Sequence, residues 1–187
     1  AVKDATNTGI KNAGMGVHIK EWGKDIMEVM ESYEVNIDNK TYPVQVIKNL
    51  GGHNILKNKI HGGIFLPGTY IEYYPEHLKF EEGIYAVETF GSTASDSVIE
   101  KHEENTIYMN KSLTSNKLDE NMKLFYDNLL KKYNTMPYCD RYLDNQYNSI
   151  YKSKMKTLTD IGYVNKYPPL YCANNGMTAQ YEHTIYI

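Results

Sequence analysis

The sequence has few cysteines, little excess charge and no long apolar run, and each shortage excludes a class of protein. Two cysteines, Cys139 and Cys172, are too few for a disulfide framework and suit a reducing compartment. No apolar stretch approaches the length of about 18 residues that a membrane helix needs. The opening "AVKDATNTGIKNAG" indicates a polar helix rather than a signal peptide. We therefore expect a cytoplasmic protein with no membrane partner.

The charge balance also argues against a general affinity for nucleic acid. The net charge is −3 and the isoelectric point is about 6.1, so nothing draws the whole molecule to anionic surfaces. Lysines cluster at 131–132 and at 152–156, where a solvated helix face is the ordinary interpretation and a nucleic-acid contact is the alternative. We expect no specific nucleic-acid partner. With 187 residues, 41% of them hydrophobic, the chain can form a globular domain with a real core.

Hydrophobic periodicity predicts a mixture of helices and strands. Trp22, Ile26 and Met30 recur at helical spacing, and "YEVNIDNKTYPVQVI" alternates around a turn at "DNK". The expected helices are 1–13, 21–33, 118–133 and 148–163. The expected strands are a hairpin within 33–47, then 83–92, 106–109 and 177–187, with a loop or ragged hairpin at 93–105 and an extended, turn-rich segment at 164–176.

The stretch "GGHNILKNKIHGG" (51–63) holds two histidines, His53 and His61, each beside a pair of glycines. Eight residues span about 26 Å in a straight strand and about 12 Å in a helix, whereas a zinc–nitrogen bond is about 2 Å long. The chain must therefore bend if both imidazoles serve one site, and the glycines permit such a bend. A shared site, two separate catalytic groups and two ordinary loop histidines all stay open.

Two glutamates fall in the middle of expected strands. Alternation places Glu88 on one face with Ala86, and Glu182 on one face with Gln180, while His183 points to the opposite face. A carboxylate among apolar neighbours is costly unless it is paired or bound to metal. Carboxylates together with a glycine-flanked histidine are typical ligands of a divalent ion. The alternative, a solvated face, stays open for either glutamate.

Several long motifs occur in one order along the chain: "GHNI", "IHGG", "EEGIYAVETFGS", "DIGYVNKYPPL" and "TAQYEHTI". Together they resemble the methionine aminopeptidases of type 2, and the resemblance runs from Ala1 to Ile187. It implies an α/β (α+β) pita-bread (creatinase/aminopeptidase) fold: the C-terminal half, with a curved antiparallel sheet, plus a type 2 helical insert. The implied division is 1–110 for the catalytic domain, 111–168 for the insert and 169–187 for a return strand.

The resemblance implies a metalloaminopeptidase that removes the initiator methionine from new proteins. Its cofactors would be two divalent metal ions (Mn, Co, Fe or Zn), and its partners would be nascent polypeptide N-termini close to the ribosome. The implied metal ligands are His53, Glu88 and the bridging carboxylate Glu182. His61 would be the catalytic histidine that contacts the scissile peptide, and Ile60, His61 and Tyr167 would bind the substrate.

The family uses further ligands that do not occur in this sequence. Two aspartates and a substrate-contacting histidine precede the segment that matches Ala1. Three ligands of five cannot build the two-metal site, so we expect a C-terminal portion of a larger enzyme that is inactive alone. Leu56 also replaces the glycine that usually ends the family pattern G-H-x-I-G.

A second function is compatible with the same resemblance. Some pita-bread relatives have lost their metal ligands and bind ribosomes or RNA as scaffolds. Such relatives tend to lose the glutamate of "AQYEHT", whereas Glu182 is present here together with His53 and Glu88. The ligand set therefore favours the enzyme over the scaffold.

Overall fold

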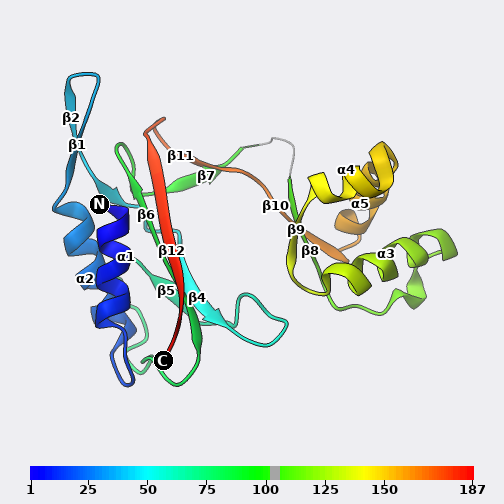
Figure 1. Cartoon of the computed structure of the whole chain (residues 1–187), viewed down its shortest axis with the longest axis horizontal. Coiled ribbons are helices and arrows are strands. Elements are labelled where there is room, and N and C mark those ends of the chain that lie inside the picture. The colour runs from blue at the N-terminus through cyan, green and yellow to red at the C-terminus, as the bar shows by residue number, and fades with distance from the viewer. Residues whose placement is uncertain (102–105) are drawn as a thin grey trace. The chain divides into compact units, whose positions relative to one another are not determined.

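The structure, a computed structural model, describes residues 1–101 and 106–187 and contains two compact units (Figure 1). Unit 1 comprises residues 1–56, 61–99 and 170–187, and unit 2 comprises residues 57–60 and 100–169. Each unit has its own cluster of buried hydrophobic side chains. None of the helices in the described residues is both long enough and apolar enough to cross a membrane.

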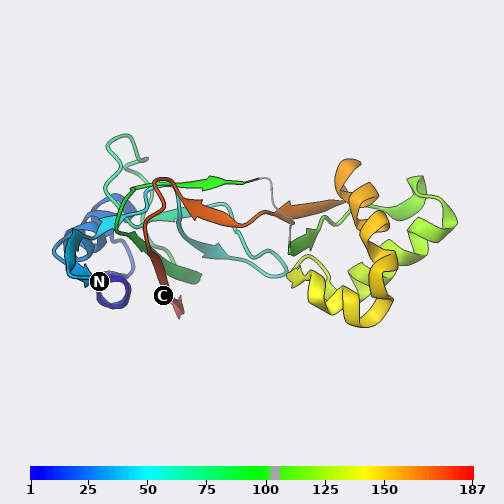
Figure 2. The same cartoon turned by 90° about the horizontal axis from the view of Figure 1, so that it is seen from above.

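Unit 1 consists of two helices packed on an antiparallel sheet, an arrangement seen from two sides in Figure 1 and Figure 2. The helices are α1 (Val2–Asn12) and α2 (Ile19–Glu31). The sheet has the order β12-β6-β4-β5, with β3 also paired to β6. Its strands are β3 (Gln45–Val46), β4 (Gly51–Ile55), β5 (Phe65–Pro67), β6 (Ile84–Ser92) and β12 (Thr178–Tyr186). The predicted helices 1–13 and 21–33 and the predicted strands 83–92 and 177–187 are confirmed to within a few residues.

The structure also contains two smaller, two-stranded sheets. The predicted hairpin is confirmed as β1 (Glu34–Ile37) and β2 (Lys40–Pro43). Its turn residues Asp38 and Asn39 have φ of 51° and 62°, the left-handed conformation that a two-residue hairpin turn requires. In addition, β7 (Val98–Glu100) pairs with β11 (Leu170–Cys172).

The core of unit 1 lies between the helices and the sheet. The stripe of Trp22, Ile26 and Met30 on α2 is buried, as its helical spacing predicts. The Trp22 indole Nε1–H donates a 2.7 Å hydrogen bond to the carbonyl of Gly9, which ties α2 to α1. Burying each such side chain contributes about 1.5–3 kcal/mol, so this stripe anchors the helices behind the sheet.

Unit 2 contains a three-stranded antiparallel sheet, in the order β10-β8-β9, and a group of helices. Its strands are β8 (Ile107–Asn110), β9 (Pro137–Cys139) and β10 (Val164–Tyr167). Its helices are η1 (Ser115–Lys117), α3 (Glu120–Tyr133), α4 (Asp140–Tyr147), η2 (Asn148–Ile150) and α5 (Tyr151–Asp160). The predicted helix at 118–133 is confirmed, and the Asp119 side chain caps it by accepting a hydrogen bond from the Met122 N–H.

Three local predictions are corrected by the structure. Helix α4 is not among the expected helices, because its eight residues are mainly polar and only Leu143 is buried. The helix expected over 148–163 is interrupted at its start by η2 and ends at Asp160, where Gly162 turns back with φ of 80°. The segment expected as a loop or ragged hairpin at 93–105 contains strand β7, which pairs with the distant strand β11 and not within the segment, and residues 102–105 lie outside the described residues.

Candidate metal centre

Strands β4, β6 and β12 bring three predicted ligands to one face of the sheet in unit 1. Glu182 on β12 lies directly opposite Glu88 on β6 in the antiparallel register. His53 on β4 lies opposite Ala86, two residues before Glu88. Because residues two apart on a strand share a face, the three side chains point the same way. The sheet therefore gathers side chains that are far apart in the sequence.

His53 and Glu88 are in direct contact. The His53 Nε2 lies 3.1 Å from the Glu88 Oε1, and both side chains are largely buried, with 13% and 15% of their surface exposed. The hydrogen bond that the His53 ring donates to Glu88 raises the pKa of His53, burial opposes this increase, and the negative charge of Glu182 adds to it. Glu182 also accepts a 2.7 Å hydrogen bond from the Gln180 amide. The imidazole thus lies within the electrostatic field of both carboxylates.

Glu88 lies on the strand face that alternation suggested, together with Ile84 and Ala86. Ala86 is 4% exposed and Ile84 is 45% exposed, so this face is partly buried. Burial of the Glu88 carboxylate, 15% exposed, therefore gives one reason for a partner such as His53 or a metal. The stronger reason is the register, because like charges directly opposite each other destabilise a sheet unless a cation lies between them.

The chain bends between the two histidines, as a shared site requires. The His53 and His61 rings meet edge to face with centroids 4.4 Å apart. Burial lowers the pKa of His61, and the neighbouring His53 lowers it further. A cavity of about 340 Å³ adjoins both rings, and Gly51, Gly52 and Phe65 also line it. The structure therefore places the two histidines side by side at one cavity.

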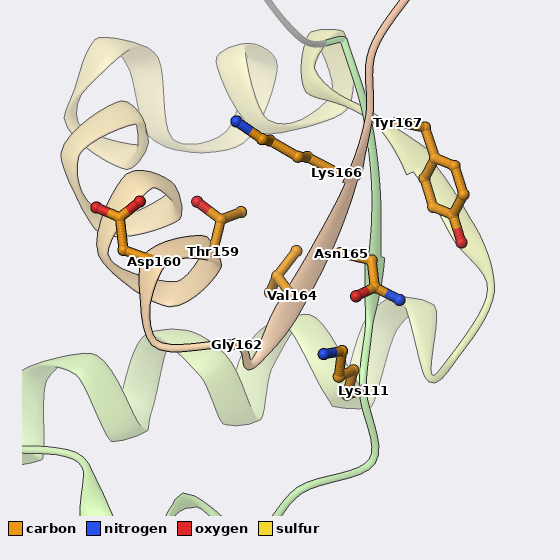
Figure 3. Close-up of a pocket in the computed structure, with 8 residues that line it drawn as sticks. All are labelled: Lys111, Thr159, Asp160, Gly162, Val164, Asn165, Lys166 and Tyr167. Atoms are coloured by element: carbon orange, nitrogen blue, oxygen red, sulfur yellow. The ribbon is translucent and has the colours of Figure 1, made fainter.

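The other two predicted substrate-binding residues lie in unit 2. Ile60 and Tyr167 belong to that unit, whereas His61 belongs to unit 1, so their shared role stays a prediction. Tyr167 lines a cavity of about 360 Å³ that also contains Lys111 and Lys166. Figure 3 shows the Tyr167 ring pointing away from Lys166, as alternation along β10 requires. This cavity contains none of the predicted metal ligands.

The donor types at the sheet fit a divalent ion, but their number is small. Carboxylate oxygens and an imidazole nitrogen are suitable ligands for Mn, Co, Fe or Zn. Within residues 1–101 and 106–187, no group of three or more His, Cys, Asp and Glu side chains is arranged so that it could hold a metal ion. His53, Glu88 and Glu182 can therefore provide part of a ligand set.

Sequence reasoning missed two polar residues at this site. The Gln180 amide fixes one oxygen of Glu182, and Asn54 bonds the backbone on the far side of the His61 loop. Alternation placed Gln180 on the face of Glu182 but did not predict this bond. For Asn54, the sequence offers only its place next to His53 and before a glycine-rich stretch.

Solved structures define the fold. The chain matches a thermophilic Arx1 with a TM-score of 0.66 and 20% identity, over 77% of this chain and 38% of that one. It matches a methionine aminopeptidase from Rickettsia prowazekii with a TM-score of 0.52 and 15% identity, over 100% of this chain and 46% of that one. The chain has the pita-bread fold, which confirms the expected fold class.

Sequence relatives define the family. The chain is 44% identical to methionine aminopeptidase 2-2 of Chaetomium globosum and 42% identical to methionine aminopeptidase 2 of Komagataella phaffii. These alignments cover 100% and 99% of this chain and 42% of each relative. No protein-family model matches the sequence. The chain belongs to the methionine aminopeptidase 2 family, and it spans less than half the length of these relatives, in their C-terminal portion.

Proposed function

We propose that the chain forms part of the active centre of a metal-dependent methionine aminopeptidase, which removes the initiator methionine from nascent proteins. The observation that carries this proposal is the opposed pair of Glu88 and Glu182, with His53 bonded to Glu88, in a chain of this family. Two carboxylates held opposite each other create a site of negative charge, and a bound cation would relieve their repulsion.

In this proposal His53, Glu88 and Glu182 would hold part of a site for two divalent ions. When bound, the ions would supply Lewis-acid activation of the peptide bond. The chain's own contribution is orientation. The sheet fixes Glu88 and Glu182 in register, and Gln180 restrains the Glu182 carboxylate through its 2.7 Å hydrogen bond. Such outer hydrogen bonds keep a ligand in the geometry that a metal needs.

His61 is proposed to act on the substrate rather than on the metal. Its ring lies edge to face against the ring of His53, so it stands beside the proposed ligands at the adjoining cavity. From there an imidazole N–H can donate a hydrogen bond to the scissile carbonyl and stabilise the negative charge that develops on it. Ile60 and Tyr167 are proposed as walls for the methionine side chain, since an apolar wall suits a thioether.

The proposed partners are nascent polypeptide N-termini at the ribosome, in the cytoplasm. The alternative, a scaffold that binds ribosomes or RNA without catalysis, is less supported. The structural likeness to Arx1 shows a shared fold only. The chain keeps the three proposed ligands, and a scaffold has no need of them.

The experiment is a chimera in which this chain replaces the matching region of the Komagataella phaffii relative. We expect it to release methionine from Met-Gly and Met-Ala peptides, to lose this activity with a chelator and to regain it with Mn, Co, Fe or Zn ions. The unaltered relative is the control. A folded chimera that binds metal but releases no methionine would contradict the proposal, and tight ribosome binding without peptidase activity would favour the scaffold.

A further inference from the structure

Asn54, the residue after His53, makes three hydrogen bonds with the far side of the His61 loop. Its side-chain Oδ1 accepts a 2.8 Å hydrogen bond from the Ile64 N–H. Its backbone N–H donates to the Ile64 carbonyl at 3.2 Å, and its carbonyl accepts from the Gly62 N–H at 2.7 Å. One residue therefore fastens both Gly62 and Ile64, which flank the turn after His61.

The asparagine side chain acts where the strand pairing stops. The register of β4 with β5 ends at the pair His53 and Phe65, so the ladder itself does not reach His61. Beyond that pair, the Asn54 amide occupies the space that a side chain at position 62 would fill. A Cβ built at Gly62 would lie 2.5 Å from the Asn54 Oδ1, and Gly63 has φ of 117°, a conformation that favours glycine. The two glycines and the asparagine thus fit together as one turn.

We propose that Asn54 is a positioning residue that holds His61 over His53. The Asn54 side chain holds the Ile64 N–H, its backbone carbonyl accepts from the N–H of Gly62, which follows His61 in the chain, and Asn54 itself follows His53 directly. Both imidazoles are thereby tied to the same short segment, which accounts for rings that lie 4.4 Å apart across a loop of seven residues. The proposal rests on the proposed function of His61 and names a residue through which that function acts.

The structural test uses the 187-residue chain and the nuclear Overhauser effect between the His53 and His61 ring protons. Asn54→Ala removes the acceptor for the Ile64 N–H. We expect a clear loss of the ring-to-ring signal, because the nuclear Overhauser effect decreases steeply as two protons separate. Asn54→Asp keeps an acceptor oxygen and should restore the signal. Asn36→Ala is the matched control, since Asn36 accepts a hydrogen bond from Thr41 in another hairpin of the same unit.

A second variant covers the case in which Asn54→Ala fails to fold. Gly62→Ala keeps the asparagine but places a methyl group against its amide, so the same loss of signal is expected. An unchanged ring-to-ring signal in folded Asn54→Ala or folded Gly62→Ala would overturn the proposal. So would an equal loss in Asn36→Ala, because the effect would then be general loosening of the unit.

The catalytic arm uses the chimera with the Komagataella phaffii relative. Asn54→Ala should lower kcat by about tenfold or more with little change in KM, since a misplaced catalytic group costs rate rather than binding. Asn54→Asp should recover most of the lost kcat. A rise in KM with kcat unchanged would overturn the positioning role, because it would mean that only substrate binding had weakened. If the chimera has no activity at all, the proposed function fails, while the ring-to-ring signal still decides the role of Asn54.

Discussion

Gly52 is a position where the packing of two strands leaves no room for a side chain. It precedes His53 on β4, and a Cβ built there would lie 2.0 Å from the carbonyl oxygen of Ala86 on β6. This close approach of two backbones allows His53 to reach Glu88 from the neighbouring strand. A glycine at this position is therefore required by strand packing and not by an unusual φ.

Replacing Gly52 with alanine should destabilise unit 1. The methyl group meets backbone, which cannot rotate away, so β4 and β6 must separate, and we expect a loss of about 1–3 kcal/mol in the free energy of unfolding. Urea denaturation measures this. Gly68→Ala is the control, because its Cβ would meet only side-chain atoms at 3.7 Å and 3.9 Å. That variant should change stability by less than about 1 kcal/mol, and an equal loss in both would contradict the account.

The roles of single residues were only partly predictable from the sequence. Alternation along strands correctly placed Glu88 and Glu182 each on one face, because the side-chain period of two is local. The direct opposition of Glu88 and Glu182 depends on the register of two strands some 90 residues apart, which no local pattern specifies. The contact of His53 with His61 depends on a turn that the Asn54 side chain closes by accepting a hydrogen bond from the Ile64 N–H. The sequence around Asn54 does not predict this hydrogen bond.

At the scale of elements, helices α1 and α2 support the sheet from behind. Trp22 of α2 connects the two helices, since its indole N–H donates to the carbonyl of Gly9 in α1. The indole also packs against Phe80 at a centroid distance of 5.3 Å. Trp22 is 1% exposed. The Thr6 hydroxyl also donates to the Tyr181 carbonyl, which joins α1 to β12. The strand that carries Glu182 is therefore held by a helix as well as by β6.

Trp22→Phe should weaken this helix layer. It leaves a cavity and removes the donor to Gly9, so we expect a loss of about 2 kcal/mol or more in the free energy of unfolding. Because Trp22 is the only tryptophan, far-UV circular dichroism replaces fluorescence as the measurement. Tyr73→Phe, at a site 89% exposed, is the control and should stay within about 0.5 kcal/mol. A loss no larger than that of the control would contradict the anchoring role.

Elements were predictable where their signal was local. The helix of 21–33 and the strand of 83–92 follow from apolar periodicity and are present as α2 and β6. Helix α4 was missed because it is short and mainly polar, and its one buried residue, Leu143, gives a weak signal that tertiary packing must support. The partner of strand β7 was missed because that partner, β11, lies about 70 residues further along the chain.

At the scale of the whole molecule, the described residues form two hydrophobic cores that share no side chain. Unit 1 contains the core around Trp22 and the three proposed metal ligands. Unit 2 contains the core around Leu129 and Tyr126. The composition, with 41% hydrophobic residues, indicated enough apolar material for a core but not its division into two.

Leu129→Ala should therefore affect unit 2 selectively. Leu129 is 1% exposed, and removing its side chain should cost about 2–5 kcal/mol within that core. Amide hydrogen exchange should speed up in α3 and α5 while β6 and β12 keep their protection, and the fluorescence of Trp22 should report an unchanged unit 1. Equal acceleration in both units would show that they unfold together and would contradict two separate cores.

The central claim is that Glu182 belongs to a metal site that performs the peptidase reaction. The most direct measurement is methionine release from a Met-Gly peptide by the chimera carrying Glu182→Gln, beside His183→Gln, whose side chain points to the opposite face of β12. Even residues that only support metal ligands are worth about 10–100-fold in activity. The account predicts a loss of at least about 100-fold for Glu182→Gln and little change for His183→Gln. Unchanged release after Glu182→Gln would contradict it.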